Sequence, residues 1–195
     1  KCGVESRILS ADHVEQPSNH IAELSDLKWQ YYPPYGMRKI RYSFAMERQL
    51  KEFVVENKNS SLIHTHNLWN YVSYLGYKMQ KNFDIPLVIS PRGSLFPWPL
   101  SQRKKFKKLS MTLFQCKSLN QSACIHVTDT SEIEAIRSLG IKAPIALIAN
   151  GVDMDEFANL DLQANCRARM SLPEDKKNIL FFSRIHPKKR LDLLV

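Results

Sequence analysis

A repeated alternation of short apolar runs with longer amphipathic stretches constrains the fold most. Apolar runs at residues 85–90 and 123–127 are typical of buried strands, and residues 95–117 between them carry apolar side chains at helical spacing. Strand, helix, strand in this order is typical of a parallel sheet flanked by helices, so the sequence predicts an α/β fold. Further strands are expected at 5–11, 60–65 and 143–148, and further helices at 38–57, 69–79 and 131–140.

The composition is that of a globular protein with a basic surface. Hydrophobic residues make up 44% and charged residues 24% of the chain, which excludes disordered and fibrous classes. A net charge of +9 would attract phosphorylated ligands, nucleic acid or an anionic membrane. No apolar run approaches the ~20 residues of a membrane span. The 4 cysteines lack Cys-x-x-Cys spacing and nothing resembles a secretory leader, so we expect reduced thiols in a cytosolic protein.

Two irregular stretches divide the sequence. Residues 15–37 are rich in proline and aromatic residues and predict a long connection, whose aromatic side chains either pack on the body or form a stacking platform for bases or sugars. Residues 155–177 are polar and are taken as a linker. The expected organisation is a first domain at 1–154, this linker, and the start of a second domain at 178–195.

Two histidines end one predicted strand. His64 and His66 are two residues apart, so they point to the same side, and Asn67 follows them. In parallel sheets ligands bind outside the carboxyl ends of strands, so these residues are candidates for an active-site edge. The alternatives are structural histidines or, with Cys124 and His126, a zinc site. No paired Cys-x-x-Cys or His-Glu-x-x-His spacing supports zinc, and we predict no metal.

The strand at 85–90 leads into a Pro-Arg-Gly-Ser turn. Gly93 permits close approach of the backbone to a ligand, and Arg92 beside it suits an acceptor or a phosphate. Arg92 could equally be an ordinary surface arginine paired with a neighbouring acid. The chain contains no G-x-G-x-x-G, Walker, G-x-S-x-G or kinase signature, so hydrolase and ATPase activities are not supported.

The predicted helix at 95–117 is strongly basic. Trp98 and Phe106 stand among its cations, and a basic amphipathic helix with aromatic residues suits an anionic membrane surface. The alternative is a surface helix whose lysines face solvent. The cations that would contact the membrane are Arg103, Lys104, Lys105, Lys107 and Lys108.

The closing stretch, residues 178–195, predicts a strand at 179–182, a basic turn with a proline, and the start of a helix. Arg184 and Lys189 then fall where the next helix presents unpaired N–H groups. A guanidinium can bind two phosphate oxygens and an ammonium adds a point charge, so this pair suits a diphosphate. The alternative is a solvated basic loop.

Several motifs, in this order, resemble the glycosyltransferases of the GT-B fold, specifically the large retaining family 4. Ile148-Ala-Asn-Gly-Val-Asp153 with Phe157 resembles the family's I-P-N-G-V-D-x-x-x-F turn, which closes the first domain. Ile179-Leu-Phe-Phe-Ser-Arg184-x4-Lys189 resembles the strand and G-R-x4-K-G loop that open the second. A strand ending His-x-His and a later Pro-x-Val-Ile-Ser-Pro-Arg-Gly fit the upstream order, so the resemblance covers nearly the whole chain.

The resemblance implies a Rossmann-like GT-B fold and transfer of a sugar from a nucleotide-sugar to a polysaccharide or glycolipid acceptor, with retention at the anomeric carbon. It implies that Arg184 and Lys189 are catalytic, because they would stabilise the charge that grows on the departing diphosphate. The nucleotide-sugar is a substrate, and no cofactor or metal is required. The implied donor-binding residues are Arg184, Lys189, Asn150 and Gly151. The implied acceptor-side residues are His64, His66, Asn67, Arg92 and Gly93.

The sequence departs from the family pattern at three positions. Ser183 and Arg190 stand where the family usually has glycine, and Arg92 stands where many members have a histidine. The family's glycine-rich first loop would precede Lys1 and its acidic donor-sugar segment would follow Val195. We therefore expect a fragment with only the first strand and helix start of the second domain, inactive by itself.

Other functions compete with this hypothesis. A nucleotide-sugar epimerase of the same fold would need several acids and histidines around the sugar, and the sequence gives no support for such a cluster. A non-catalytic basic module would bind membrane or nucleic acid through the net charge of +9. A third alternative is a catalytically incomplete remnant of the enzyme. For the enzyme we expect no nucleic-acid partner, and a cytoplasmic location at the inner face of the cytoplasmic membrane.

Overall fold

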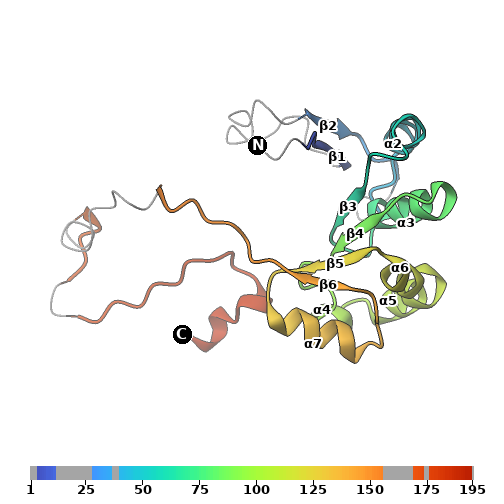
Figure 1. The fold of residues 1–195 in the computed structure, drawn as a ribbon. Helices are drawn as coiled ribbons and strands as arrows, with labels where there is room; N and C mark the ends of the chain where they lie inside the picture. The colour runs from blue at the N-terminus through green and yellow to red at the C-terminus, as the bar shows by residue number, and fades with distance from the viewer. Residues whose placement is uncertain (1–3, 12–27, 37–39, 156–168, 174–175, 195) are drawn as a thin grey trace. The chain divides into compact units, whose positions relative to one another are not determined.

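The computed structural model describes residues 4–11, 28–36, 40–155, 169–173 and 176–194 (Figure 1). The chain divides into two units, residues 1–149 and 150–195. The first unit contains parallel strands with helices packed against them, so the predicted α/β fold is confirmed.

The strands of the first unit are β1 (Arg7–Ala11), β2 (Lys28–Tyr32), β3 (Ile63–His66), β4 (Leu87–Ser90), β5 (Cys124–Val127) and β6 (Ile145–Leu147). Its helices are α2 (Phe44–Glu56), α3 (Tyr71–Phe83), α4 (Pro97–Ser101), α5 (Lys104–Ser110), α6 (Cys116–Gln121) and α7 (Thr130–Ser138), with a π-helical segment at Met111–Gln115. Among the described residues of the second unit, Pro187–Lys189 and Leu191–Leu193 are short 3₁₀ helices.

The strands form two parallel sheets. Strands β3, β4, β5 and β6 pair in that order, with Ile63 opposite Leu87 and Ile125 opposite Ile145. Strands β1 and β2 form a separate pair. Successive strands of the larger sheet advance in one direction, and right-handed crossovers then place all the connecting helices on one face.

Burial confirms that the helices share one face of the larger sheet. Leu87, Ile89, Ile125 and Val127 are at most 1% exposed. They form one core cluster with residues of three helices, namely Tyr77 of α3, Leu119 of α6 and Ile136 of α7. Alternate strand residues point to opposite faces, so His64, His66, Ser90 and His126 belong to the other face.

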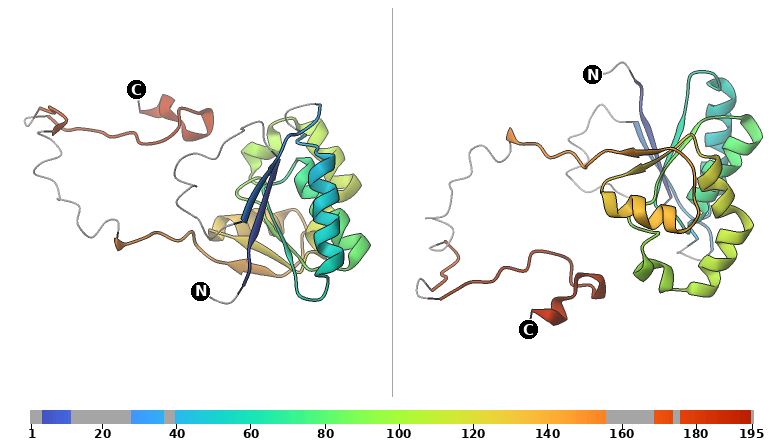
Figure 2. Two further views of the ribbon diagram at one scale, coloured as in Figure 1. Left: turned by 90° about the horizontal axis from the view of Figure 1, so that it is seen from above. Right: turned by 60° about the horizontal axis from the view of Figure 1, so that its bottom comes forward.

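A second core cluster joins the smaller sheet to helices α2 and α3. Ala11 of β1 and Tyr32 of β2 are buried together with Met46, Leu50 and Val54 of α2. Figure 2 shows the blue strands β1 and β2 beside the cyan helix α2. The amphipathic pattern at 38–57 therefore predicted the helix correctly, although α2 begins only at Phe44.

Helix α3 approaches the larger sheet closely at a glycine. A Cβ atom on Gly76 would lie 2.5 Å from Cγ2 of Thr65 and 3.2 Å from Cδ1 of Leu87. The helix begins at Asn70, whose side chain accepts a hydrogen bond from the Ser73 N–H at 3.0 Å. The absence of a side chain at Gly76 thus sets the distance between α3 and the sheet.

The connection predicted at 15–37 is partly wrong. Lys28–Tyr32 is strand β2, which pairs with β1 from Arg7 opposite Lys28 to Ala11 opposite Tyr32. Its aromatic side chains favour a strand, and pairing with β1 supplies the backbone hydrogen bonds. The remainder of this prediction up to residue 27 lies outside the described residues.

The single helix predicted at 95–117 is also wrong. The backbone breaks at Gln102 and Arg103, where Arg103 has φ of 51°, a left-handed conformation that ends a helix. Pro97 and Pro99 confine the preceding helix α4 to a short segment. A π-helical segment at Met111–Gln115 then separates α5 from α6.

The start of α7 was predicted one residue too late. Asp129 is the N-cap, and its carboxylate accepts a hydrogen bond from the Ser131 N–H at 2.8 Å. Gly140 follows the helix as predicted, with φ of 74° and its N–H donating to the Arg137 carbonyl at 3.0 Å.

Two predictions for the closing part of the chain differ from the structure. Residues 179–182 form no strand, because within the described residues no other segment pairs with them. Residues 150–153 form no turn, and neither Asn150 nor Gly151 has a positive φ. The Asn-Gly pair permits a positive φ but does not require it.

Candidate active site

The predicted acceptor-side residues meet at the carboxyl edge of the larger sheet. The rings of His64 and His66, both on β3, lie 4.3 Å apart. The N–H of Asn67 donates to the carbonyl of Ser90 at 2.9 Å. Ser90 is the last residue of β4 and precedes the loop at 91–94, which contains Arg92 and Gly93. The structure therefore joins the two predicted loops, as the parallel sheet requires.

These loops have unusual backbone conformations. Asn67 and Trp69 have φ of 65° and 67°, and Arg92 and Gly93 have φ of 53° and 71°. Left-handed conformations cost energy in residues other than glycine and are common at functional sites. The indole Nε1 of Trp69 donates to the carbonyl of Ser94 at 3.3 Å, which ties the two loops together.

A buried glutamate holds the loop after β4 in place. Glu132 is 5% exposed, and its Oε1 accepts a hydrogen bond from the N–H of Gly93. Its Oε2 accepts from the N–H and the hydroxyl of Thr128, at 3.0 and 3.2 Å. Glu132 was not among the residues predicted from the sequence. Its position three residues after the N-cap Asp129, where a capping box has glutamate, could have identified it.

The two histidines of β3 are held neutral. Burial, then the charges of His66, His126 and Arg92, lower the pKa of His64 to about 4. The pKa of His66 is lowered by burial, then by Arg92 and His126. Near neutral pH both rings are therefore hydrogen-bonding groups and not cations.

Ser90 and His126 extend this edge across the sheet. Ser90 was not predicted from the sequence, and His126 was named there only for the zinc alternative. The hydroxyl of Ser90 lies 2.7 Å from Nε2 of His64 and 2.8 Å from Nδ1 of His126. Their shared face follows from the strand alternation, but their contact depends on the register between β3, β4 and β5. Register requires tertiary packing and could not be read from the sequence.

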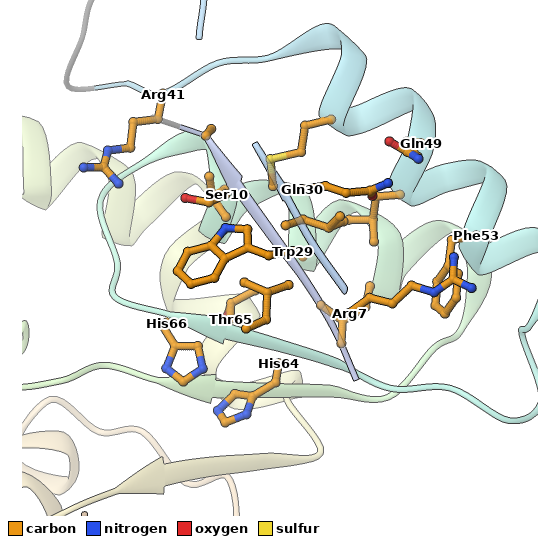
Figure 3. Close-up of a pocket in the computed structure, with 18 of the residues that line it drawn as sticks. Arg7, Ser10, Trp29, Gln30, Arg41, Gln49, Phe53, His64, Thr65 and His66 are labelled. Carbon is orange, nitrogen blue, oxygen red and sulfur yellow. The ribbon is translucent and has the colours of Figure 1, made fainter. Parts of the chain in front are cut away.

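A cavity of about 680 Å³ adjoins these residues (Figure 3). It lies between the smaller sheet, helix α2 and strand β3, and His64, His66 and Asn67 line its edge. Its volume is within the range of small-molecule sites, about 300–1,000 Å³. Polar and aromatic side chains from the other walls are Arg7, Ser10, Trp29, Gln30, Arg41 and Gln49.

The predicted donor-side residues belong to the second unit. Asn150, Gly151, Arg184 and Lys189 are all exposed. Lys189 ends a 3₁₀ helix, and its N–H donates to the carbonyl of His186 at 2.8 Å. The roles of these residues as a diphosphate site stay predictions.

One of the predicted membrane-facing cations turns inward. The ammonium of Lys107 lies 5.3 Å from the centre of the Trp69 ring and donates to the carbonyl of Pro99. Burial, then the charge of Arg103, lowers its pKa. The other predicted cations are exposed, namely Arg103, Lys104, Lys105 and Lys108.

The described part of the chain has neither a cluster of metal ligands nor a helix that could span a membrane. It contains no group of three or more His, Cys, Asp or Glu side chains that could hold a metal ion. None of its helices is both long and apolar enough to cross a bilayer. Cys116 and Cys124 are free thiols.

The fold and the site define the class of the protein. The parallel, Rossmann-like sheet has polar groups gathered at its carboxyl edge, the edge at which α/β domains of this kind bind ligands. The model of Glycosyltransferase Family 4 matches residues 2–156, and the chain belongs to this family, as the sequence motifs predicted.

A relative supports the same family. D-inositol 3-phosphate glycosyltransferase of Kineococcus radiotolerans is 39% identical over 69 residues. These residues make up 35% of this chain and 16% of that protein. The match therefore spans less than one fifth of the relative's length.

Proposed function

We propose that the chain is part of a glycosyltransferase that transfers a sugar from a nucleotide-sugar donor to a saccharide or lipid-linked acceptor, with retention at the anomeric carbon. The family match over residues 2–156 carries the proposal, because this range contains the whole acceptor-side edge. The name of the relative, which refers to an inositol phosphate, supports a hydroxyl-bearing acceptor.

The edge that contains His64, His66 and Arg92 would bind the acceptor, next to the cavity of about 680 Å³. Arg184 and Lys189 would bind the donor diphosphate and stabilise the charge that develops as the glycosidic bond breaks, supported by Asn150 and Gly151. One hydrogen-bond donor that stabilises charge in a transition state commonly lowers the activation free energy by about 3 kcal/mol. The site as proposed requires no metal and no cofactor.

Arg190 has a different role in this proposal. Its guanidinium pairs with the carboxylate of Asp192 at 2.9 Å, and its φ of 51° is left-handed. Arg190 thus adopts a backbone conformation that favours glycine. Glycine is the residue that the family pattern usually has at this position. The pairing with Asp192 supports Lys189 as the cation that binds phosphate.

Nucleotide binding tests the proposal. In the longest natural polypeptide that contains residues 1–195, uridine, guanosine or adenosine diphosphate should raise the melting temperature. Arg184→Ala should abolish the shift, whereas Arg48→Ala, at an exposed arginine of α2, should leave it unchanged. Stabilisation by none of the three nucleotides would contradict the proposal. The anomeric configuration of the product, measured by NMR, tests retention.

A peripheral membrane contact is a second part of the proposal. Trp98, Phe106, Leu109 and Leu113 are 42–65% exposed, and exposed lysines flank them. Apolar side chains among cations suit the boundary of an anionic bilayer, and would place the enzyme at the inner face of the cytoplasmic membrane. In sedimentation with phosphatidylglycerol vesicles, Lys104→Glu with Lys105→Glu should release the protein. Binding that is unaffected by these charges would contradict the contact.

A basic module without catalysis is the competing function. Its binding to membrane or nucleic acid would weaken steeply with salt and would not depend on the base of a nucleotide. The nucleotide experiment above separates the two, because only a donor site distinguishes uridine, guanosine and adenosine diphosphates.

A further inference from the structure

A chain of three hydrogen bonds crosses the larger sheet at the candidate site. Nε2 of His64 lies 2.7 Å from the hydroxyl of Ser90, which lies 2.8 Å from Nδ1 of His126. Nε2 of His126 lies 3.0 Å from the carbonyl oxygen of Ile148. The chain therefore runs from β3 through β4 and β5 to the residue after β6.

The carbonyl oxygen fixes the direction of the whole chain. It can only accept, so Nε2 of His126 must carry a proton. In a neutral imidazole the other nitrogen, Nδ1, is then an acceptor, and the Ser90 hydroxyl donates to it. The oxygen of Ser90 is left to accept a hydrogen bond, which Nε2–H of His64 donates. His64 therefore carries its proton on Nε2 and a lone pair on Nδ1.

Burial makes Ser90 the element that fixes this direction. Ser90 is 0% exposed, so water does not replace either histidine as its partner. The register of β3 on β4 places it between the two rings. Within the described residues, Nδ1 of His64 has no hydrogen-bond partner, and His64 lines the cavity of about 680 Å³.

We propose that Ser90 is a positioning residue, which holds neutral His64 with Nδ1 as a hydrogen-bond acceptor for a neutral hydroxyl group of the acceptor substrate. A phosphate or carboxylate oxygen has no proton to donate to this lone pair, so an anionic group is disfavoured at this point. The identity of the partner as a substrate rests on the proposed function. The proton position on His64 does not.

Burial, and then the neighbouring basic groups, lower the pKa of His64 and keep it neutral. His66 lies on the same strand, His126 on β5, and Arg92 in the loop after β4, and each opposes protonation of His64. Arg7 of β1 also lines the cavity. The direction of the chain holds while His126 is neutral. A protonated His126 would donate from Nδ1, and Ser90 would then donate to His64 and move the His64 proton to Nδ1.

Long-range ¹H–¹⁵N correlation NMR on the ¹⁵N-labelled chain tests the assignment near neutral pH. We expect His64 to show one tautomer, protonated on Nε2. A His64 ring that is protonated on Nδ1 at neutral pH, or that shows a mixture of both forms, would overturn the proposal.

Substitutions separate this role from a purely structural one. Ser90→Ala should produce a mixture of both tautomers at His64. Ser122→Ala is the matched control, because Ser122 is also buried and donates to the Leu119 carbonyl at 2.8 Å, away from the histidines. It should leave His64 unchanged. If Ser90→Ala does not fold, His126→Phe removes the acceptor of the Ser90 hydroxyl and should likewise end the single tautomer. An unchanged tautomer in the variant that folds would refute the assignment.

Kinetics on the longest natural polypeptide extend the test to the substrate. One lost hydrogen bond corresponds to about a tenfold rise in the KM of the acceptor, and Ser90→Ala should leave the KM of the donor unchanged. Equal changes in both constants would contradict an acceptor role. The tautomer experiment needs no substrate, so its result stands or falls independently of the nucleotide experiment.

Discussion

Two apolar runs of similar composition adopt different structures in this chain. Leu87–Ser90 forms β4, in which Leu87 and Ile89 are at most 1% exposed. In the run at 179–182, Ile179 is 77% and Phe182 94% exposed. Strand β4 has β3 and β5 as partners, and helices cover one face of it. An apolar run thus becomes a strand only where neighbouring strands take up its hydrogen bonds.

Truncation of one isoleucine in each run should give the largest contrast. Ile89→Ala leaves a cavity in the core and should lower the free energy of unfolding by about 2–5 kcal/mol. Ile179→Ala, at an exposed position, should change it by less than about 0.5 kcal/mol. Urea denaturation of the two variants measures this. Similar losses in both would show that the second unit has a core of its own.

Two glycines, Gly76 in the first unit and Gly151 in the second, differ in the same way in how closely other atoms pack against them. Gly76→Ala places a Cβ 2.5 Å from Thr65 Cγ2 and should destabilise the chain by about 1–3 kcal/mol through overpacking. Gly151→Ala meets no atom within 4 Å and its φ is not positive, so it should be neutral. Thermal unfolding compares them. A neutral Gly76→Ala would mean that α3 can move away from the sheet without cost.

Two glutamates of one helix separate a buried polar contact from an exposed one. Glu132→Ala leaves the N–H groups of Gly93 and Thr128 without their acceptor and should cost about 1–2 kcal/mol. Glu134→Ala, at an exposed position on the same helix, should cost almost nothing. Amide hydrogen exchange at Gly93 should rise in the first variant alone. Unchanged hydrogen exchange at Gly93 would show that Glu132 does not position the loop after β4.

The smallest effect expected is in the pH dependence of stability. The pKa of His64 falls from 6.5 to about 4 on folding, so between these values the unfolded chain binds the proton and the folded chain does not. The contribution of His64 to the free energy of unfolding is fully present above pH 6.5 and is lost as the pH falls toward about 4. His64→Gln should flatten the slope of the urea midpoint plotted against pH. An unaltered slope in His64→Gln would contradict a depressed pKa.

Much of the fold followed from local patterns. The strands near 60–65, 85–90 and 123–127 were predicted from apolar runs, and three of the helices from their spacing. The break at Arg103 was missed because a left-handed arginine leaves no signal in composition. Strand β2 was missed because its aromatic residues adjoin prolines, and only pairing with β1 reveals it.

The residues of the candidate site also divide into those that the sequence predicted and those that it did not. His64, His66, Asn67, Arg92 and Gly93 were found because strand ends and breaks in the pattern mark the carboxyl edge of a parallel sheet. Ser90 and Glu132 were not predicted, and His126 was named only for the unsupported zinc site, because their roles depend on register and on a contact between distant loops. Sequence therefore indicates which loops carry the site, and packing determines how the side chains are held.

The cavity has a consequence for the behaviour of the chain in solution. Strands β1 and β3 both line it, and within the described residues each pairs with a strand on one side alone. An edge strand with an open row of backbone groups is a template for any extended polypeptide. Within the described residues, β1 and β3 are therefore two of the sheet edges at which chains can associate, and self-association should increase with protein concentration unless another segment covers them.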